Sequence, residues 1–250
     1  MLLHLKNAIY LAWMDIQARY KKSAFGPLWL TFGNLISVIG LGIVWGSMLK
    51  EDLSTFLPSI ATGLITWQFI SISISESCDI FIAHAFIIRN VKMPLFFFTS
   101  RLIARHLINL MHNTPIIIGV MLYYHLPFNQ ITLLSLLGIV LVTLNLAWLT
   151  FVIGIASARY RDISYAITSF MPILFFLTPI IFRPDHIPGV LRAVADYNPL
   201  AHFVSIIRYP ILGQVPSLSS YIIVCSILLI GVILTNFVNR KYSRKLAFWI

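Results

Sequence analysis

Residues 106–158 read HLINLMHNTPIIIGVMLYYHLPFNQITLLSLLGIVLVTLNLAWLTFVIGIASA and contain no Asp, Glu, Lys or Arg over 53 positions. A helix needs roughly 20 apolar residues to cross the hydrocarbon core of a bilayer. The stretch is therefore long enough to cross twice, with a break at residues 123–130, YYHLPFNQ. It predicts two transmembrane helices joined by a short loop.

Four further uncharged windows lie on either side of this stretch: 23–49, 53–75, 163–182 and 209–239. Each is long enough to cross a bilayer once, so the chain is predicted to cross six times. The predicted spans are 27–49, 57–76, 106–125, 131–156, 163–182 and 217–238. With only 10% charged residues and a mean hydropathy of +0.88, the sequence predicts an all-α, polytopic membrane protein with a single transmembrane domain over residues 1–250.

The basic residues are concentrated in the gaps between the spans and favour one side. Six spans place both termini on the same side, and that side receives 14 of the 18 Lys and Arg residues. Short loops rich in Lys and Arg remain in the cytoplasm. Both termini are therefore predicted to be cytoplasmic, with residues 239–250 forming a cytoplasmic tail.

Residues 1–22 precede the first span and predict an amphipathic helix in the headgroup plane of the cytoplasmic leaflet. Its apolar stripe would consist of Leu2, Leu5, Ile9, Trp13, Ile16 and Tyr20. Its polar side would consist of His4, Asn7, Asp15 and Arg19.

A second segment outside the spans, residues 183–216, contains five prolines among apolar runs too short to cross. This composition fits a re-entrant helical hairpin in the outer leaflet, placed before the last span. It fits an interfacial loop equally well.

The sequence signatures of several function classes are absent. The chain has no Gly-Lys pair, hence no phosphate-binding loop for ATP, and no His-x-x-x-His or Cys-x-x-Cys spacing for a metal site. No catalytic residues are predicted. The net charge of +10 does not indicate nucleic-acid binding, because the charges flank the spans. An ion channel or coupled carrier would need intramembrane carboxylates or a selectivity filter; the nearest carboxylates, Glu76 and Asp79, are interpreted as a solvated helix end.

Three motifs, in this order, carry a family resemblance. The first is DIQARYKKSAFGPLWL at residues 15–30, and the second is SARYRDI at 157–163 followed by FFLTPIIF at 175–182. The third combines Asn198-Pro199-Leu200 with Arg208 and Leu212-Gly213. Together they resemble the membrane permease subunit of type-2 ABC exporters, in particular the O-antigen, capsular and teichoic-acid polysaccharide export permeases. The resemblance covers essentially the whole chain.

This resemblance implies a homodimer that works with two copies of a separate ATPase subunit. ATP and Mg would be bound by the ATPase, so no cofactor is expected in this chain. The implied substrate is a polysaccharide carried on a polyprenyl pyrophosphate lipid, exported across the bacterial cytoplasmic (inner) membrane. A type-2 ABC permease for drug, antibiotic or lipid efflux is the alternative.

The resemblance also implies where the ATPase docks: on the N-terminal helix, on the segment around residues 80–90, and on the turn after the fourth span. The implied coupling residues are His84, Phe86, Arg89, Arg159, Arg161 and Asp162. The alternatives are an interfacial helix with a snorkelling arginine and an ordinary positive-inside anchor.

Arg19, Lys21 and Lys22 lie just before the first span, at inner headgroup level. Clustered cations at this depth would attract the lipid pyrophosphate as it enters the transporter. Ordinary topology determination is the alternative.

Aromatic residues within the spans are predicted to line the channel, because ring faces can pack on the apolar faces of sugars without a fixed hydrogen-bond register. The predicted lining residues are Trp29 and Trp67, with Tyr123 and Tyr209 around the outer exit. A lipid-facing position is the alternative for each. Three polar residues of the third span are predicted to serve helix packing or pore polarity: Asn109, His112 and Asn113.

Overall fold

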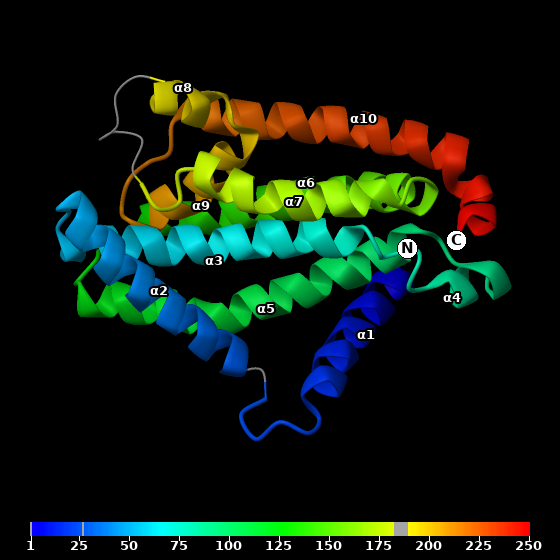
Figure 1. Cartoon of the computed structure of the whole chain (residues 1–250), viewed down its shortest axis with the longest axis horizontal. Helices are drawn as coiled ribbons and strands as arrows, with labels where there is room; N and C mark the ends of the chain where they lie inside the picture. The colour runs from blue at the N-terminus through cyan, green and yellow to red at the C-terminus, as the bar shows by residue number, and fades with distance from the viewer. Residues whose placement is uncertain (1, 27, 183–189) are drawn as a thin grey trace.

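The computed structural model of the chain describes residues 2–26, 28–182 and 190–250, and this part of the chain is built from helices without strands. Its long helices run along one axis in alternating directions (Figure 1). They are α2 (Leu28–Leu49), α3 (Leu53–Ser77), α5 (Phe96–Tyr123), α6 (Gln130–Arg159), α7 (Asp162–Leu177) and α10 (Leu218–Trp249).

Both termini lie at the same end of this bundle, which we call the termini end (Figure 1). The short helix α4 (Ala85–Asn90) also lies there, whereas α8 (Val190–Tyr197) and α9 (Pro199–Ile211) lie at the opposite, distal end. The remaining helix, α1 (Leu2–Tyr20), starts at the termini end and slopes away from the bundle axis.

Four of the described helices are long and apolar enough to cross a membrane: α2, α3, α6 and α10. The sequence predicted six spans. Of the other two, α7 has only 16 residues, and α5 carries Arg101 and Arg105 near its start and polar side chains at its centre. The structure thus confirms an all-helical, multi-pass chain.

Several helix limits differ from the predicted spans, and local chemistry explains two of them. The start of α3 lies four residues early because Asp52 caps it, its carboxylate accepting a hydrogen bond from the Ser54 N–H at 3.0 Å. The end of α7 lies at Leu177, since Thr178 precedes a proline and takes extended backbone angles. Residues 239–249 of the predicted tail are part of α10, which continues to Trp249.

The distal core is organised around α9, most of whose side chains are buried. This helix packs against α3, α6 and α10. A glycine on α6 permits the approach, since a Cβ at Gly138 would lie 2.4 Å from the carbonyl oxygen of Ile206. Residues 183–189 of the predicted hairpin lie outside the described residues, and the rest of it forms α8, α9 and the connection at 212–216 that leads to α10.

The first helix attaches to α5 by a narrow face. Ala8, Ala12 and Ile16 are buried against the bundle. Leu5 and Trp13, from the predicted apolar stripe, are 48% and 44% exposed. The protein therefore leaves most of that stripe uncovered, as a helix that contacts lipid headgroups requires.

Candidate functional site

A cluster of charged side chains joins α1, α3 and α5 around a cavity of about 370 Å³ near the termini end. Arg101 on α5 holds Asp15 on α1 with two hydrogen bonds, Nε to Oδ2 at 2.8 Å and Nη2 to Oδ1 at 2.5 Å. One helical turn later, Arg105 donates to Glu76 at the end of α3. The neighbouring His106 ring nitrogen Nε2 lies 3.2 Å from the same carboxylate.

This cluster corrects one sequence-based interpretation. Glu76 is not a solvated helix end, because Arg105 and His106 contact its carboxylate. Asp15, from the predicted polar side of α1, faces Arg101 on α5. The i, i+4 spacing of Arg101 and Arg105 was a signal for both pairs, because it places the two guanidinium groups on one helix face.

His84, in the connection between α3 and α4, extends the cluster. Its Nδ1 lies 2.8 Å from the Ile80 carbonyl oxygen, and its Nε2 lies 3.3 Å from Nη1 of Arg101. Because arginine can only donate, Nε2 must accept and the imidazole is neutral in this arrangement. Burial lowers the pKa of His84 below its usual value of 6.5, and the positive charge of Arg101 acts in the same direction.

The other predicted coupling residues lie on the surface of the termini end. Phe86 on α4 is 80% exposed, and Arg89 of the same helix is exposed as well. Arg161 and Asp162 are exposed in the turn between α6 and α7. Arg159 is exposed too, but its guanidinium lies over the ring of Trp249, 5.3 Å from the ring centroid.

The three cations predicted to meet a lipid pyrophosphate differ in their surroundings. Arg19 reaches toward Glu76, with Nη2 3.9 Å from Oε1. Lys21 and Lys22 follow α1 in the turn that leads to α2, and both are exposed.

One of the predicted channel residues lines a groove of about 440 Å³ between α3 and α7. Trp67 lies in its wall, 5.9 Å from Phe175 between ring centroids. Hydroxyl groups line the same groove, from Ser71, Ser75 and Thr168. This surface therefore offers both aromatic rings and hydroxyl groups.

The other three predicted lining residues lie elsewhere, so a single chain does not bring the four together. Trp29 is 57% exposed near the start of α2, in edge contact with Phe25 and Phe32. Tyr123 ends α5 and is 77% exposed. Tyr209 belongs to α9.

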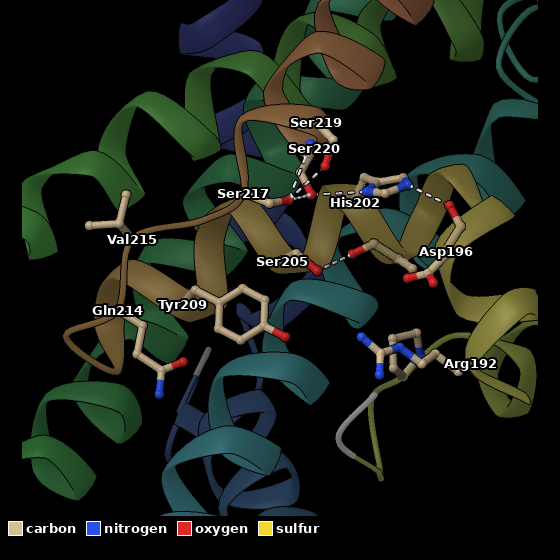
Figure 2. A pocket seen from close by; sticks show the side chains of 12 residues that line it. Arg192, Asp196, His202, Ser205, Tyr209, Gln214, Val215, Ser217, Ser219 and Ser220 are labelled. Carbon is tan, nitrogen blue, oxygen red and sulfur yellow. Dashed lines mark hydrogen bonds between the residues drawn. The ribbon is translucent and has the colours of Figure 1, made fainter. Parts of the chain in front are cut away.

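Tyr209 borders a polar pocket of about 300 Å³ at the distal end (Figure 2). His202 connects its walls: the ring contacts the Ser220 hydroxyl at 3.0 Å and the Asp196 carbonyl oxygen at 2.9 Å. The pocket thus joins α8, α9 and the start of α10. Its lining is rich in hydroxyl groups, including Ser205, Ser217 and Ser219.

The second and third sequence motifs meet beside this pocket. Asn198 caps α9 and donates through Nδ2 to the hydroxyl of Thr178 at 3.0 Å. Arg208, which is 1% exposed, donates to the carbonyl oxygen of Pro179 at 2.6 Å. These motif residues therefore fasten α9 to the chain that leaves α7.

One polar residue of the third predicted span, Asn113, serves helix packing through its side chain. Asn34 on α2 donates through Nδ2 to Oδ1 of Asn113 on α5 at 2.8 Å. Thr31 donates to the carbonyl oxygen of His112 at 2.9 Å. These bonds join α2 to α5, the kind of interhelical contact expected inside a membrane.

Apolar helices of spanning length, joined by polar contacts in their interior, define a multi-pass membrane protein. The sequence matches the ABC-2 type transporter family over residues 7–212. The chain therefore belongs to this family of membrane permeases and is a transport subunit, as the motifs predicted, and not an enzyme.

The chain is similar to permeases of known systems. It is 26% identical over 194 residues to an O-antigen export system permease protein, RfbA, of Klebsiella pneumoniae, covering 76% of this chain and 74% of the relative. A second RfbA from the same organism is 24% identical over the same shares. RfbA of Myxococcus xanthus is 20% identical over 175 residues, covering 70% of this chain and 67% of that protein.

Proposed function

We propose that the chain is the permease subunit of an ATP-driven exporter that moves a lipid-linked polysaccharide, such as O antigen, across the bacterial cytoplasmic membrane. The observation that carries this proposal is the similarity to three O-antigen export permeases over 70–76% of the chain. The sequence has no phosphate-binding loop, so ATP and Mg would be bound by a separate ATPase subunit.

In this proposal α2, α3, α5, α6, α7 and α10 cross the membrane, and the termini end faces the cytoplasm. The alternating directions of these helices support six crossings (Figure 1). The placement of 14 of the 18 basic residues on the side of the termini supports the orientation. The helices α8 and α9 form the re-entrant hairpin near the outer surface.

Two surfaces of the termini end would receive the ATPase. The first is α4, which offers Phe86 and Arg89, and the second is the turn that holds Arg161 and Asp162. The charged cluster supports a mechanical role for the first surface. His84 precedes α4 and contacts Arg101, which also holds α1 through Asp15. A displacement of α4 by the ATPase would therefore be transmitted to α1 and α5.

The groove between α3 and α7 would form part of the polysaccharide path. None of the described side chains of α7 is buried, and Tyr165 and Phe176 on it are 74% and 59% exposed. An apolar helix with so much exposed surface supports a second copy on this side. The rings of Trp67 and Phe175 would offer the weak, repeated contacts that a sliding polymer needs.

The lipid pyrophosphate would enter near Lys21 and Lys22, whose exposed cations lie just before α2. Their charge favours a polyanionic headgroup at the inner leaflet.

Reconstitution tests this function directly. The chain, purified together with its ATPase subunit and placed in proteoliposomes, should transport lipid-linked polysaccharide only when ATP is supplied. The chain without its ATPase should hydrolyse no ATP. In cells, deleting the gene should leave lipid-linked polymer in the cytoplasm. Export of a drug or free lipid, with normal polymer at the surface of the deletion strain, would support the efflux alternative instead.

A further inference from the structure

A cleft of about 440 Å³ lies between the last turns of α6 and α10, at the termini end. Val152 and Ala156 line its α6 side and Val238 lines its α10 side. Just before it, the two helices are in close contact, since a Cβ at Gly231 would lie 2.2 Å from the ring of Trp148. The cleft opens in the turns that follow this contact.

Two cations, Arg159 and Lys245, border the cleft. The guanidinium of Arg159 lies 5.3 Å from the ring centroid of Trp249 and 5.7 Å from that of Tyr160. Stacking of this kind engages the face of the guanidinium and leaves the N–H groups at its edge available. In residues 2–26, 28–182 and 190–250, neither cation pairs with an Asp or Glu side chain.

The helix α10, which forms one wall of the cleft, also has a face that is exposed on the outside of the bundle. The outward face of α10 is apolar, with Ile230, Ile233 and Phe237 exposed by 64%, 70% and 55%. In a membrane protein such a face contacts lipid hydrocarbon. The cleft borders the same helix and combines apolar walls with two cations and aromatic rings, Tyr242 and Trp249, at headgroup depth.

We propose that this cleft binds an anionic phospholipid of the surrounding bilayer. An acyl chain would lie between α6 and α10, and the phosphate would receive hydrogen bonds from Arg159 and Lys245. Both requirements of the ligand, an apolar chain and a negative headgroup, follow from the charge and the shape of the site. The proposal does not depend on which substrate is exported.

The bound lipid would have a structural consequence. It would connect the end of α10 to the end of α6, directly before the turn of Arg161 and Asp162. That turn is one of the two surfaces proposed to receive the ATPase, so the lipid would hold it in place from the membrane side.

Quenching of Trp249 by brominated lipid tests the site. The chain is placed in phosphatidylcholine nanodiscs that contain either brominated phosphatidylglycerol or brominated phosphatidylcholine. The emission of Trp249 is obtained as the difference between the wild type and Trp249→Phe, which keeps a ring beside Arg159. Brominated phosphatidylglycerol should quench this emission at roughly 30-fold lower mole fraction, because two cations contribute about fivefold each.

Matched variants separate this site from diffuse attraction. Arg159→Gln with Lys245→Gln should abolish the preference, whereas Arg159→Lys with Lys245→Arg should keep it. Ala156→Phe, which fills the cleft without changing charge, should also abolish it. Arg240→Gln with Arg244→Gln removes the same charge from exposed positions of α10 outside the cleft and should leave the preference intact.

Three results would overturn the proposal. The first is equal quenching by the two brominated lipids in the wild type. The second is loss of the preference in the Arg240 and Arg244 control, which would show that attraction is diffuse. The third is relief of quenching by polyprenyl phosphate at lower mole fraction than by unlabelled phosphatidylglycerol, which would assign the cleft to the transported lipid.

Discussion

Three arginines at the termini end, Arg101, Arg105 and Arg159, differ in how their guanidinium groups are held. Arg101 holds a carboxylate with two N–H groups, while Arg105 bridges toward Glu76 and, at 3.9 Å, toward Asp15. Arg159 lies against aromatic rings. Residue type alone does not reveal these differences, since all three arginines count equally toward the positive-inside charge.

A prediction at this scale concerns His84 and pH. The folded chain holds this imidazole neutral, and its pKa lies below 6.5. The unfolded chain takes up the proton near pH 6.5, so the stability that neutral His84 contributes is complete above this pH and is lost as the pH falls toward the lowered pKa. The difference in Tm between the wild type and His84→Gln should shrink from pH 7.5 to pH 5.5. A pH-independent difference would contradict the neutral assignment.

A second prediction concerns Phe86. Because its side chain is 80% exposed on α4, Phe86→Asp should leave the chain folded and inserted. If α4 docks on the ATPase, a charge buried at that interface should uncouple ATP hydrolysis from export. Transport and hydrolysis in proteoliposomes measure this, with Phe86→Leu as an apolar control. Normal export by Phe86→Asp would remove α4 from the interface.

At the scale of elements, the position of a helix also depends on contacts that its own apolar pattern does not predict. The helix α1 has an apolar stripe, yet only Ile16 of that stripe is buried among the described residues, and the attachment also uses two alanines and an ion pair. The helix α9 is too short to span, and it becomes part of the core because Gly138 allows it to approach α6.

The attachment of α1 gives a third prediction. Asp15→Asn removes one charge of a bidentate pair whose side chains are 19% and 25% exposed. Loss of such a hydrogen-bonded pair costs about 1–3 kcal/mol, so Tm in detergent should fall. Faster proteolysis within residues 20–26 would show that α1 has detached. The exchange Asp15→Arg with Arg101→Asp should recover part of the loss, and no recovery would argue against direct pairing.

At the scale of the whole molecule, the single chain leaves α7 exposed and the groove beside it open. The helix α7 lies on the outside of the bundle beside a groove lined by Trp67, Phe175 and hydroxyl groups. Trp29, Tyr123 and Tyr209 lie away from this groove. A single chain therefore does not join these four rings into one continuous path.

The groove gives a fourth prediction. Thr168→Trp places a large ring in the groove and should reduce export of long polymer at least severalfold, while short lipid-linked precursors are affected less. Ala166→Trp adds the same bulk at an exposed position of α7 that does not line the groove, and it should export normally. Polymer length at the cell surface is the measurement. Equal export by the two variants would exclude this groove from the path.

The sequence by itself determined that the chain is an all-helical, multi-pass membrane protein and, through its ordered motifs, the family to which it belongs. Each uncharged window is long enough to cross a bilayer as a helix. Few other backbone structures are possible there, because backbone groups without hydrogen bonds are too costly in lipid. Helix ends were predicted less well. The cap at Asp52 places the start of α3 before its predicted limit, and the proline after Thr178 ends α7 early. The helix α10 continues into the predicted tail.

Only the tertiary structure decided which polar side chains meet. The pair of Asp15 and Arg101 is separated by 86 residues, and the contact of Asn198 with Thr178 joins two motifs. The cleft with Arg159 and Lys245 also depends on two helices that are distant in sequence. The hydropathy of a segment indicates whether that segment is buried. These pairings instead depend on how several helices pack together, and the periodicity of the sequence does not predict that packing.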